Sequence, residues 1–152
     1  MTETAKTLLG FDYGTKRIGV AVGQSLTRSA SPLTTLTAIN NKPDWDAISR
    51  LIREWRPDAL VLGLPLNDDD SANDMTRAAQ RFGNQLQGRY NLPVYTVNER
   101  LSSVEAEHIL TQTAPKKRQR NPTFSSQYNK TDIDKLAAKL ILESWFASHA
   151  DI

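Results

Sequence analysis

The sequence predicts an α/β fold in which an N-terminal antiparallel hairpin is joined to a partly parallel sheet. Two apolar segments near the N-terminus are separated by only a few residues, as in a hairpin. After them, segments with helical apolar spacing alternate with short apolar runs, as in parallel sheets. The chain of 152 residues contains no repeat or linker, so we expect a single domain over residues 1–152.

The composition indicates a cytoplasmic protein. There are no cysteines, so disulfides and thiolate metal sites are excluded. The polar N-terminus lacks the features of a signal peptide, and no apolar run is long enough to span a bilayer. We therefore expect no membrane partner.

The first three strands are predicted from apolar alternation. Residues 7–13 and 17–23 are expected to pair as an antiparallel hairpin, because the connection between them is very short. The second segment has the period of two that is typical of a strand, and one face of it consists of Ile18, Val20 and Val22. A third strand is expected within residues 33–39.

Helices and short strands then alternate. Apolar residues at helical spacing predict a helix over residues 45–55, which Pro57 ends. The short apolar run 59–63 is typical of a buried parallel strand. The next helix is expected to pack one face, formed by Met75, Ala78, Ala79, Phe82 and Leu86. Residues 94–97 are the last predicted strand.

The C-terminal third is predicted to hold two helices around a long loop. Ser102 and Glu105 have the spacing of a capping box, so a helix is expected from there to about Thr111. Residues 114–130 have no periodicity, and loops of that length are often functional. The final helix is expected from about Asp132, with a core face formed by Leu136, Ala137, Leu140, Ile141 and Trp145.

Several acids stand where either local structure or chemistry can explain them. Asp12 interrupts an apolar strand, where an unpaired carboxylate is costly, so it is either a turn cap or a ligand. Glu99 follows a predicted parallel strand, where α/β proteins place their sites, or it is an exposed acid paired with Arg100. Asp132 and Asp134 open the last helix, where acids complement the helix dipole and act as caps.

Acids from three separate elements can converge on one edge of the sheet, with no histidine or cysteine beside them. Carboxylate ligands suit Mg²⁺ or Mn²⁺. Two such ions can activate a water and stabilise the leaving oxygen during phosphodiester hydrolysis. The acids therefore favour the hypothesis of a metal-dependent nuclease.

Four segments of the sequence, in order along the chain, match the motifs of a known protein family. They are Phe11–Ala21, Leu62–Asn67, Glu99–Ser102 and Ile133–Leu142. With these segments the sequence resembles the YqgF/RuvX family, which is related to the RuvC-type Holliday junction resolvases. The resemblance implies a ribonuclease H-like fold, with a mixed five-stranded sheet, an N-terminal antiparallel hairpin and helices on both faces. One departure is visible, because Asn98 stands where the family usually has an Asp.

The resemblance also implies a site and a role. It implies that Asp12, Glu99 and Asp134 are the catalytic and metal-binding acids, with Asp132 as a further candidate ligand of the metal. The expected cofactor is Mg²⁺ or Mn²⁺. The implied role is that of a nuclease in the maturation of the 5′ end of 16S ribosomal RNA, with the precursor RNA as the partner.

Three alternatives remain open. The first is cleavage of Holliday junctions, a branched DNA, which we rank second because fold similarity is a weak guide to substrate. A resolvase is expected to be a homodimer, since a four-way junction requires two symmetric cuts. The second is a non-catalytic nucleic-acid-binding module. The third is a sugar-kinase or actin-like nucleotide-binding domain, which needs two such domains where 152 residues leave room for one.

Contacts to the nucleic acid are expected from basic residues. The net charge is only +2, yet the segment 111–131 contains no acid and five basic residues, Lys116, Lys117, Arg118, Arg120 and Lys130. This segment either follows a phosphate backbone or is simply a solvated loop. Lys16 and Arg100 are candidate phosphate contacts near the acids. Arg17 is the weaker candidate, because its position on an alternating strand allows it to face away.

Overall fold

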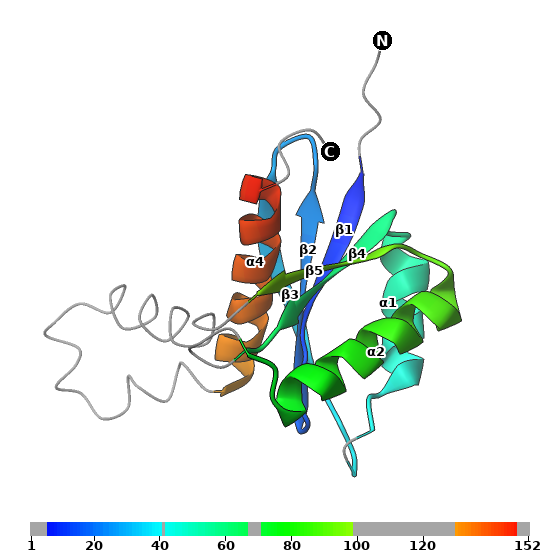
Figure 1. The fold of residues 1–152 in the computed structure, drawn as a ribbon. Helices are drawn as coiled ribbons and strands as arrows, with labels where there is room; N and C mark the ends of the chain where they lie inside the picture. Colours follow the sequence, from blue (N-terminus) through cyan, green and yellow to red (C-terminus); the bar gives the residue numbers. More distant parts are fainter. Residues whose placement is uncertain (1–5, 41, 67–70, 99–129, 149–152) are drawn as a thin grey trace, which may run out of the picture.

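The computed structural model describes residues 6–40, 42–66, 71–98 and 130–148. In these residues five strands form one sheet in the order β3-β2-β1-β4-β5 (Figure 1). The strands are β1 (Thr7–Asp12), β2 (Arg17–Gln24), β3 (Ser29–Thr37), β4 (Ala59–Leu64) and β5 (Val94–Asn98). β1, β2 and β3 pair in antiparallel fashion, whereas β4 is parallel to both β1 and β5. The predicted mixed sheet with an N-terminal hairpin is therefore confirmed.

Helices cover both faces of this sheet, as the resemblance implies. Two of them, α1 (Trp45–Trp55) and α2 (Asp74–Tyr90), lie on one face, and α4 (Lys130–Ser148) lies on the other (Figure 1). None of the helices in the described ranges combines the length and the apolar character that a membrane span needs.

The strands divide their side chains between two hydrophobic clusters. In β1, Leu9 and Phe11 belong to the cluster under α1 and α2, whereas Leu8 belongs to the cluster under α4. The face predicted from the alternation of β2 lies under α1 and α2, where Ile18 and Val20 are fully buried. Period-two alternation therefore assigns each residue of the hairpin to one of two helical layers.

Capping interactions position the helices on the α1 and α2 face. Arg56 ends α1 in the left-handed conformation, directly before Pro57. Asn73 and Thr76 form a capping box at the start of α2, with hydrogen bonds of 2.9 and 3.0 Å. The hydroxyl of Thr76 also donates to the carbonyl of Pro65, which ties the start of α2 to the segment that follows β4.

Two predicted elements differ from the structure. β3 begins at Ser29, four residues before the predicted range, since an edge strand tolerates a proline such as Pro32. α4 begins at Lys130, and its buried residues include Ala138, Leu142 and Phe146, whereas Leu136 and Leu140 are only half-buried. The predicted core residues Ala137, Ile141 and Trp145 are buried as expected. The observed face extends one position beyond the predicted one, because apolar residues occur nearly all round this helix.

Other predicted elements do not fall within the described residues. The predicted helix from Ser102 to Thr111 lies outside them. The predicted loop over 114–130 also lies outside them, except for Lys130, which is the first residue of α4.

Candidate active site

The three parallel strands end at the same edge of the sheet. Phe11 of β1, Leu62 of β4 and Thr96 of β5 form one row across the strands. Asp12, the last residue of β1, stands one position beyond this row. Open α/β sheets place their sites at this carboxyl edge. Glu99, which follows the last residue of β5 in the sequence, lies outside the described residues.

Asp12 is a buried acid on the α4 face of the sheet. Leu8 and Gly10, which alternate with it along β1, face α4, and the side chain of Asp12 is only 9% exposed. The flanking aromatic residues take the opposite side, since Phe11 and Tyr13 both contact Phe82 of α2 at ring-centroid distances of 5.8 and 4.9 Å. These two rings anchor the end of β1 and leave Asp12 turned towards α4.

Asp134 reaches the same place from α4, because a glycine allows close approach. Gly19 of β2 is the cross-strand partner of Asp12. A Cβ on Gly19 would be 2.0 Å from the backbone oxygen of Asp134, so no other residue type fits under this turn of the helix. Asp12 and Asp134, separated by more than a hundred residues in sequence, therefore occupy neighbouring positions on one face of the sheet.

Arg17 also belongs to this site, although its sequence position left its direction open. Its Nε donates to Oδ2 of Asp134 at 2.7 Å, with the two side chains 32% and 21% exposed. Asp134 is thus held in an ion pair by a residue of the opposite element of the site. The direction of Arg17 could have been predicted from the residues that share its face of β2. These are the small residues Gly19 and Ala21, and small residues on one face of a strand indicate a closely packed neighbour.

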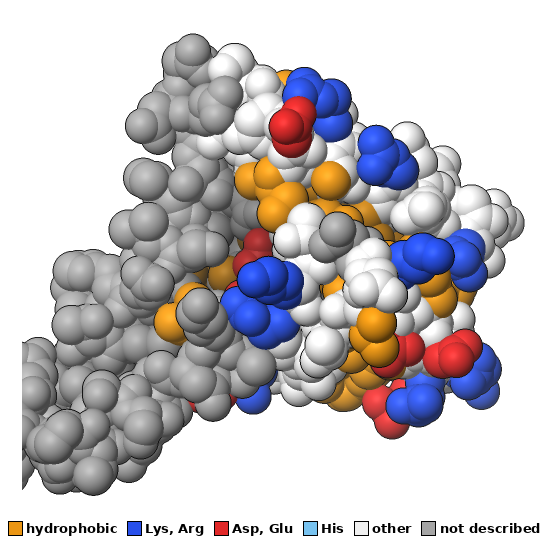
Figure 2. Space-filling view, turned by 90° about the horizontal axis from the view of Figure 1, so that it is seen from below, with side chains coloured by type: hydrophobic (Ala, Val, Ile, Leu, Met, Phe, Trp, Pro, Cys, Tyr) orange, Lys and Arg blue, Asp and Glu red, His pale blue; other side chains and the backbone are white. Residues whose placement is uncertain are grey.

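Two other described candidates are close in sequence to this pair, and they are Asp132 and Lys16. Asp132 lies in the first turn of α4, and its Oδ1 is 3.6 Å from Nζ of Lys135. Lys16 is exposed in the turn between β1 and β2, directly before Arg17. Seen from below, an acidic side chain is set back between basic and hydrophobic side chains on this end of the molecule (Figure 2).

The remaining predicted contacts to nucleic acid are not tested by the structure. Lys130 is the first residue of α4. The other five lie outside the described residues, and they are Arg100, Lys116, Lys117, Arg118 and Arg120.

The described donors fit a hard divalent cation. Asp12 and Asp134 both offer carboxylate oxygens, the ligands that Mg²⁺ and Mn²⁺ prefer. Asp12 is buried at the carboxyl edge of the sheet, where its carboxylate could help to hold such a cation. Within the described ranges, no three acidic or histidine side chains are grouped closely enough to hold a metal on their own.

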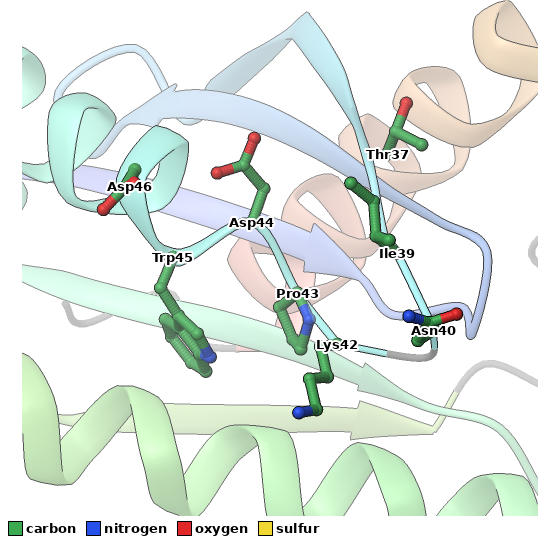
Figure 3. A pocket seen from close by; sticks show the side chains of 8 residues that line it. All are labelled: Thr37, Ile39, Asn40, Lys42, Pro43, Asp44, Trp45 and Asp46. Carbon is green, nitrogen blue, oxygen red and sulfur yellow. The ribbon is translucent and has the colours of Figure 1, made fainter.

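A separate pocket of about 430 Å³ lies between the end of β3 and the first turn of α1 (Figure 3). Its lining comprises Thr37, Ile39, Asn40 and residues 42–46. Asp44 in this lining caps α1, since its Oδ1 accepts from the backbone N–H of Ala47 at 3.1 Å. The lining contains none of the predicted site residues, so this pocket is distinct from the edge where Asp12 lies.

Comparison with known proteins shows a match over nearly the whole chain. A family model described as "RuvX: Holliday junction resolvase" matches residues 6–148. A relative from Nitrosococcus oceani is 48% identical over 145 residues, which cover 95% of this chain and 89% of the relative. One from Pseudomonas aeruginosa is 47% identical over 144 residues, or 95% of this chain and 94% of the relative. Both carry the provisional name of a pre-16S rRNA nuclease.

Solved structures that are distant in sequence share the fold. The Fowlpox virus resolvase in complex with Holliday junction DNA matches with a TM-score of 0.57 and 14% identity, covering 93% of this chain and 97% of that one. RuvC of T. thermophilus in complex with a Holliday junction matches with a TM-score of 0.51 and 16% identity, covering 96% of both chains. At such identities the likeness concerns the fold, and it confirms the predicted ribonuclease H-like class.

Proposed function

The chain belongs to the RuvX family, and on that premise we propose that it is a metal-dependent endonuclease that acts as a single domain in the 5′-end maturation of precursor 16S rRNA. The chain spans nearly the full length of relatives that carry the provisional name of pre-16S rRNA nuclease. This proposed role implies a cytoplasmic location.

One observation carries the proposal, namely the contact between Gly19 and Asp134. Because Gly19 pairs with Asp12, this contact puts two carboxyl-bearing residues side by side at the carboxyl edge of the sheet. The support for Glu99 as the third acid comes from the strand before it. β5 ends at Asn98, directly before Glu99 in the sequence, and its carboxyl end lies at the same edge of the sheet as that of β1.

In this proposal Asp12, Glu99 and Asp134 hold one or two Mg²⁺ or Mn²⁺ ions, and Asp132 is a further candidate ligand. The bound cation supplies activation of the attacking water and offsets the negative charge that develops at the scissile phosphate. The remaining residues of the site hold these acids in position. Phe11 and Tyr13 fix the end of β1 against α2, and Gly19 fixes the height of Asp134 above the sheet.

Basic residues are proposed to bind the phosphate backbone. Lys16 is exposed in the turn beside the acids. The basic segment over residues 111–131 and Arg100 would extend this surface and supply affinity without reading sequence.

The test of the nuclease is the variant Asp12→Asn, assayed for cleavage of precursor 16S RNA with Mg²⁺ and then Mn²⁺. The cleavage rate is expected to fall about 10²–10³-fold, because a metal ligand supports several kcal/mol of transition-state stabilisation. Asp46→Asn is the matched control, since Asp46 is an exposed acid in the first turn of α1. An unchanged cleavage rate in Asp12→Asn would show that these acids are not the metal ligands.

The substrate is tested by running precursor 16S RNA and a four-way DNA junction side by side. Cleavage of the RNA alone is the expected result. Paired symmetric cuts in the junction, together with a dimeric mass in solution, would instead support the resolvase. Binding without cleavage under both metals would support a non-catalytic nucleic-acid-binding module.

A further inference from the structure

The ion pair between Arg17 and Asp134 suggests how this site is held before a cation arrives. Nε of Arg17 lies 2.7 Å from Oδ2 of Asp134, and both side chains are mostly buried. Arg17 starts β2, two residues before Gly19, so both residues project on the same face of the strand. β2 therefore contacts Asp134 at two points. Gly19 lies against the backbone oxygen of Asp134, and Arg17 binds its carboxylate.

Charge explains why a basic residue is needed there. Asp12 is buried next to the position that Asp134 occupies, so two acidic side chains lie at neighbouring positions. A guanidinium is always charged and donates in a fixed direction. It can therefore balance the charge of the Asp134 carboxylate.

We propose that Arg17 is a positioning residue that keeps Asp134 in place and competes with the divalent cation for its carboxylate. Metal binding is then an exchange, in which Arg17 releases Oδ2 of Asp134. Its freed guanidinium becomes available to a phosphate on the same face of the sheet. This inference rests on the proposed function, because it assumes that Asp134 binds a metal.

The direction of the effect distinguishes this role from a purely structural one. If Arg17 only supported the fold of the site, its removal would weaken metal binding. If it competes for Asp134, its removal strengthens metal binding. We expect Arg17→Gln to bind Mn²⁺ about tenfold more tightly than the original protein, because the cation no longer displaces a charge-assisted hydrogen bond from Asp134.

The experiment is calorimetric titration of Mn²⁺ into the full chain without nucleic acid. Arg17→Lys retains the charge and is expected to bind Mn²⁺ with nearly the original affinity. Arg77→Gln is the matched control, because Arg77 also pairs with an aspartate, Asp74, but on the exposed surface of α2. Its affinity for Mn²⁺ is expected to be unchanged.

A second readout follows the guanidinium directly by NMR. The Nε–H signal of Arg17 is expected to be protected from solvent exchange without metal and to lose that protection when Mg²⁺ is added. Protection that persists at saturating Mg²⁺ would overturn the exchange.

The outcomes separate this inference from the proposed function. Affinity that is unchanged or weaker in Arg17→Gln, in a protein whose Asp12→Asn variant loses Mn²⁺ binding, overturns the role of Arg17 and leaves the nuclease intact. Absence of Mn²⁺ binding in both the original protein and Arg17→Gln overturns the metal assignment and this inference with it.

Discussion

Gly19 lies directly beneath the backbone carbonyl of Asp134, at a distance that leaves no room for a side chain. A Cβ at position 19 would be 2.0 Å from that oxygen and 2.9 Å from the backbone nitrogen of Lys135. Backbone atoms of a helix cannot turn away as a flexible side chain can. The first turns of α4, and with them Asp134, are thus placed by a glycine on β2.

Gly19→Ala is therefore expected to push α4 off the sheet. We expect a loss of about 2–3 kcal/mol in the free energy of unfolding, measured by urea denaturation, because overpacking forces the backbone to shift. Gly88→Ala is the control, since a Cβ on Gly88 meets nothing within 4 Å. That change is expected to raise stability by up to about 1 kcal/mol, as alanine replaces glycine in a helix. Equal effects at the two positions would contradict the close approach.

Phe82 is expected to be a major contributor to stability, because it joins the end of β1 to both helices on its face. Its ring contacts Phe11, Tyr13 and Trp45. Phe82→Ala is expected to cost about 3–5 kcal/mol in urea denaturation. Tyr95→Ala is the comparison, because Tyr95 stacks on Trp145 and is 41% exposed, and it is expected to cost about 1 kcal/mol. A smaller loss for Phe82→Ala than for Tyr95→Ala would refute this prediction.

Thr76 tests whether the start of α2 is held by hydrogen bonds or by packing. Its buried hydroxyl donates to Pro65 and accepts from the backbone N–H of Asn73. Thr76→Val keeps the shape and leaves those two groups unsatisfied, so we expect a loss of about 1–3 kcal/mol on thermal or urea unfolding.

Thr76→Ser provides the matching case, since it keeps the hydroxyl and removes one methyl group. Its expected cost is only about 0.8 kcal/mol. If the serine variant is the less stable of the two, packing rather than hydrogen bonding holds this corner.

The basic segment is tested through the salt dependence of nucleic-acid binding. We expect the combined variant Lys116→Gln, Lys117→Gln and Arg118→Gln to bind RNA more weakly. We also expect the slope of log affinity against log salt to be shallower by about 0.7 for each lost phosphate contact on a single strand. The matched control neutralises Arg50, Arg53 and Arg81, which are exposed on α1 and α2. An unchanged slope in the first variant would identify the segment as a solvated loop.

Local patterns in the sequence sufficed for most of the sheet. The alternation of Ile18 and Val20 correctly predicts both the strand and the face that it buries, because a strand's side-chain direction depends only on position along the chain. The same patterns were weaker for α4, whose apolar residues extend nearly all round it. The prediction was correct for Ala137, Ile141 and Trp145 but not for Leu136 and Leu140, which are only half-buried.

The sequence by itself determined the order of the elements and the acids that are candidates for the site. It predicted the mixed sheet and singled out Asp12 and Asp134. Four motifs along the chain also carry the resemblance to a nuclease family. Only the tertiary structure decided which of these residues meet. Arg17 and Asp134 are 117 residues apart and Asp12 is joined to them through Gly19, and such long-range contacts depend on which helix covers which face of the sheet. Periodicity describes the two faces of a strand, but it does not state what packs against either of them.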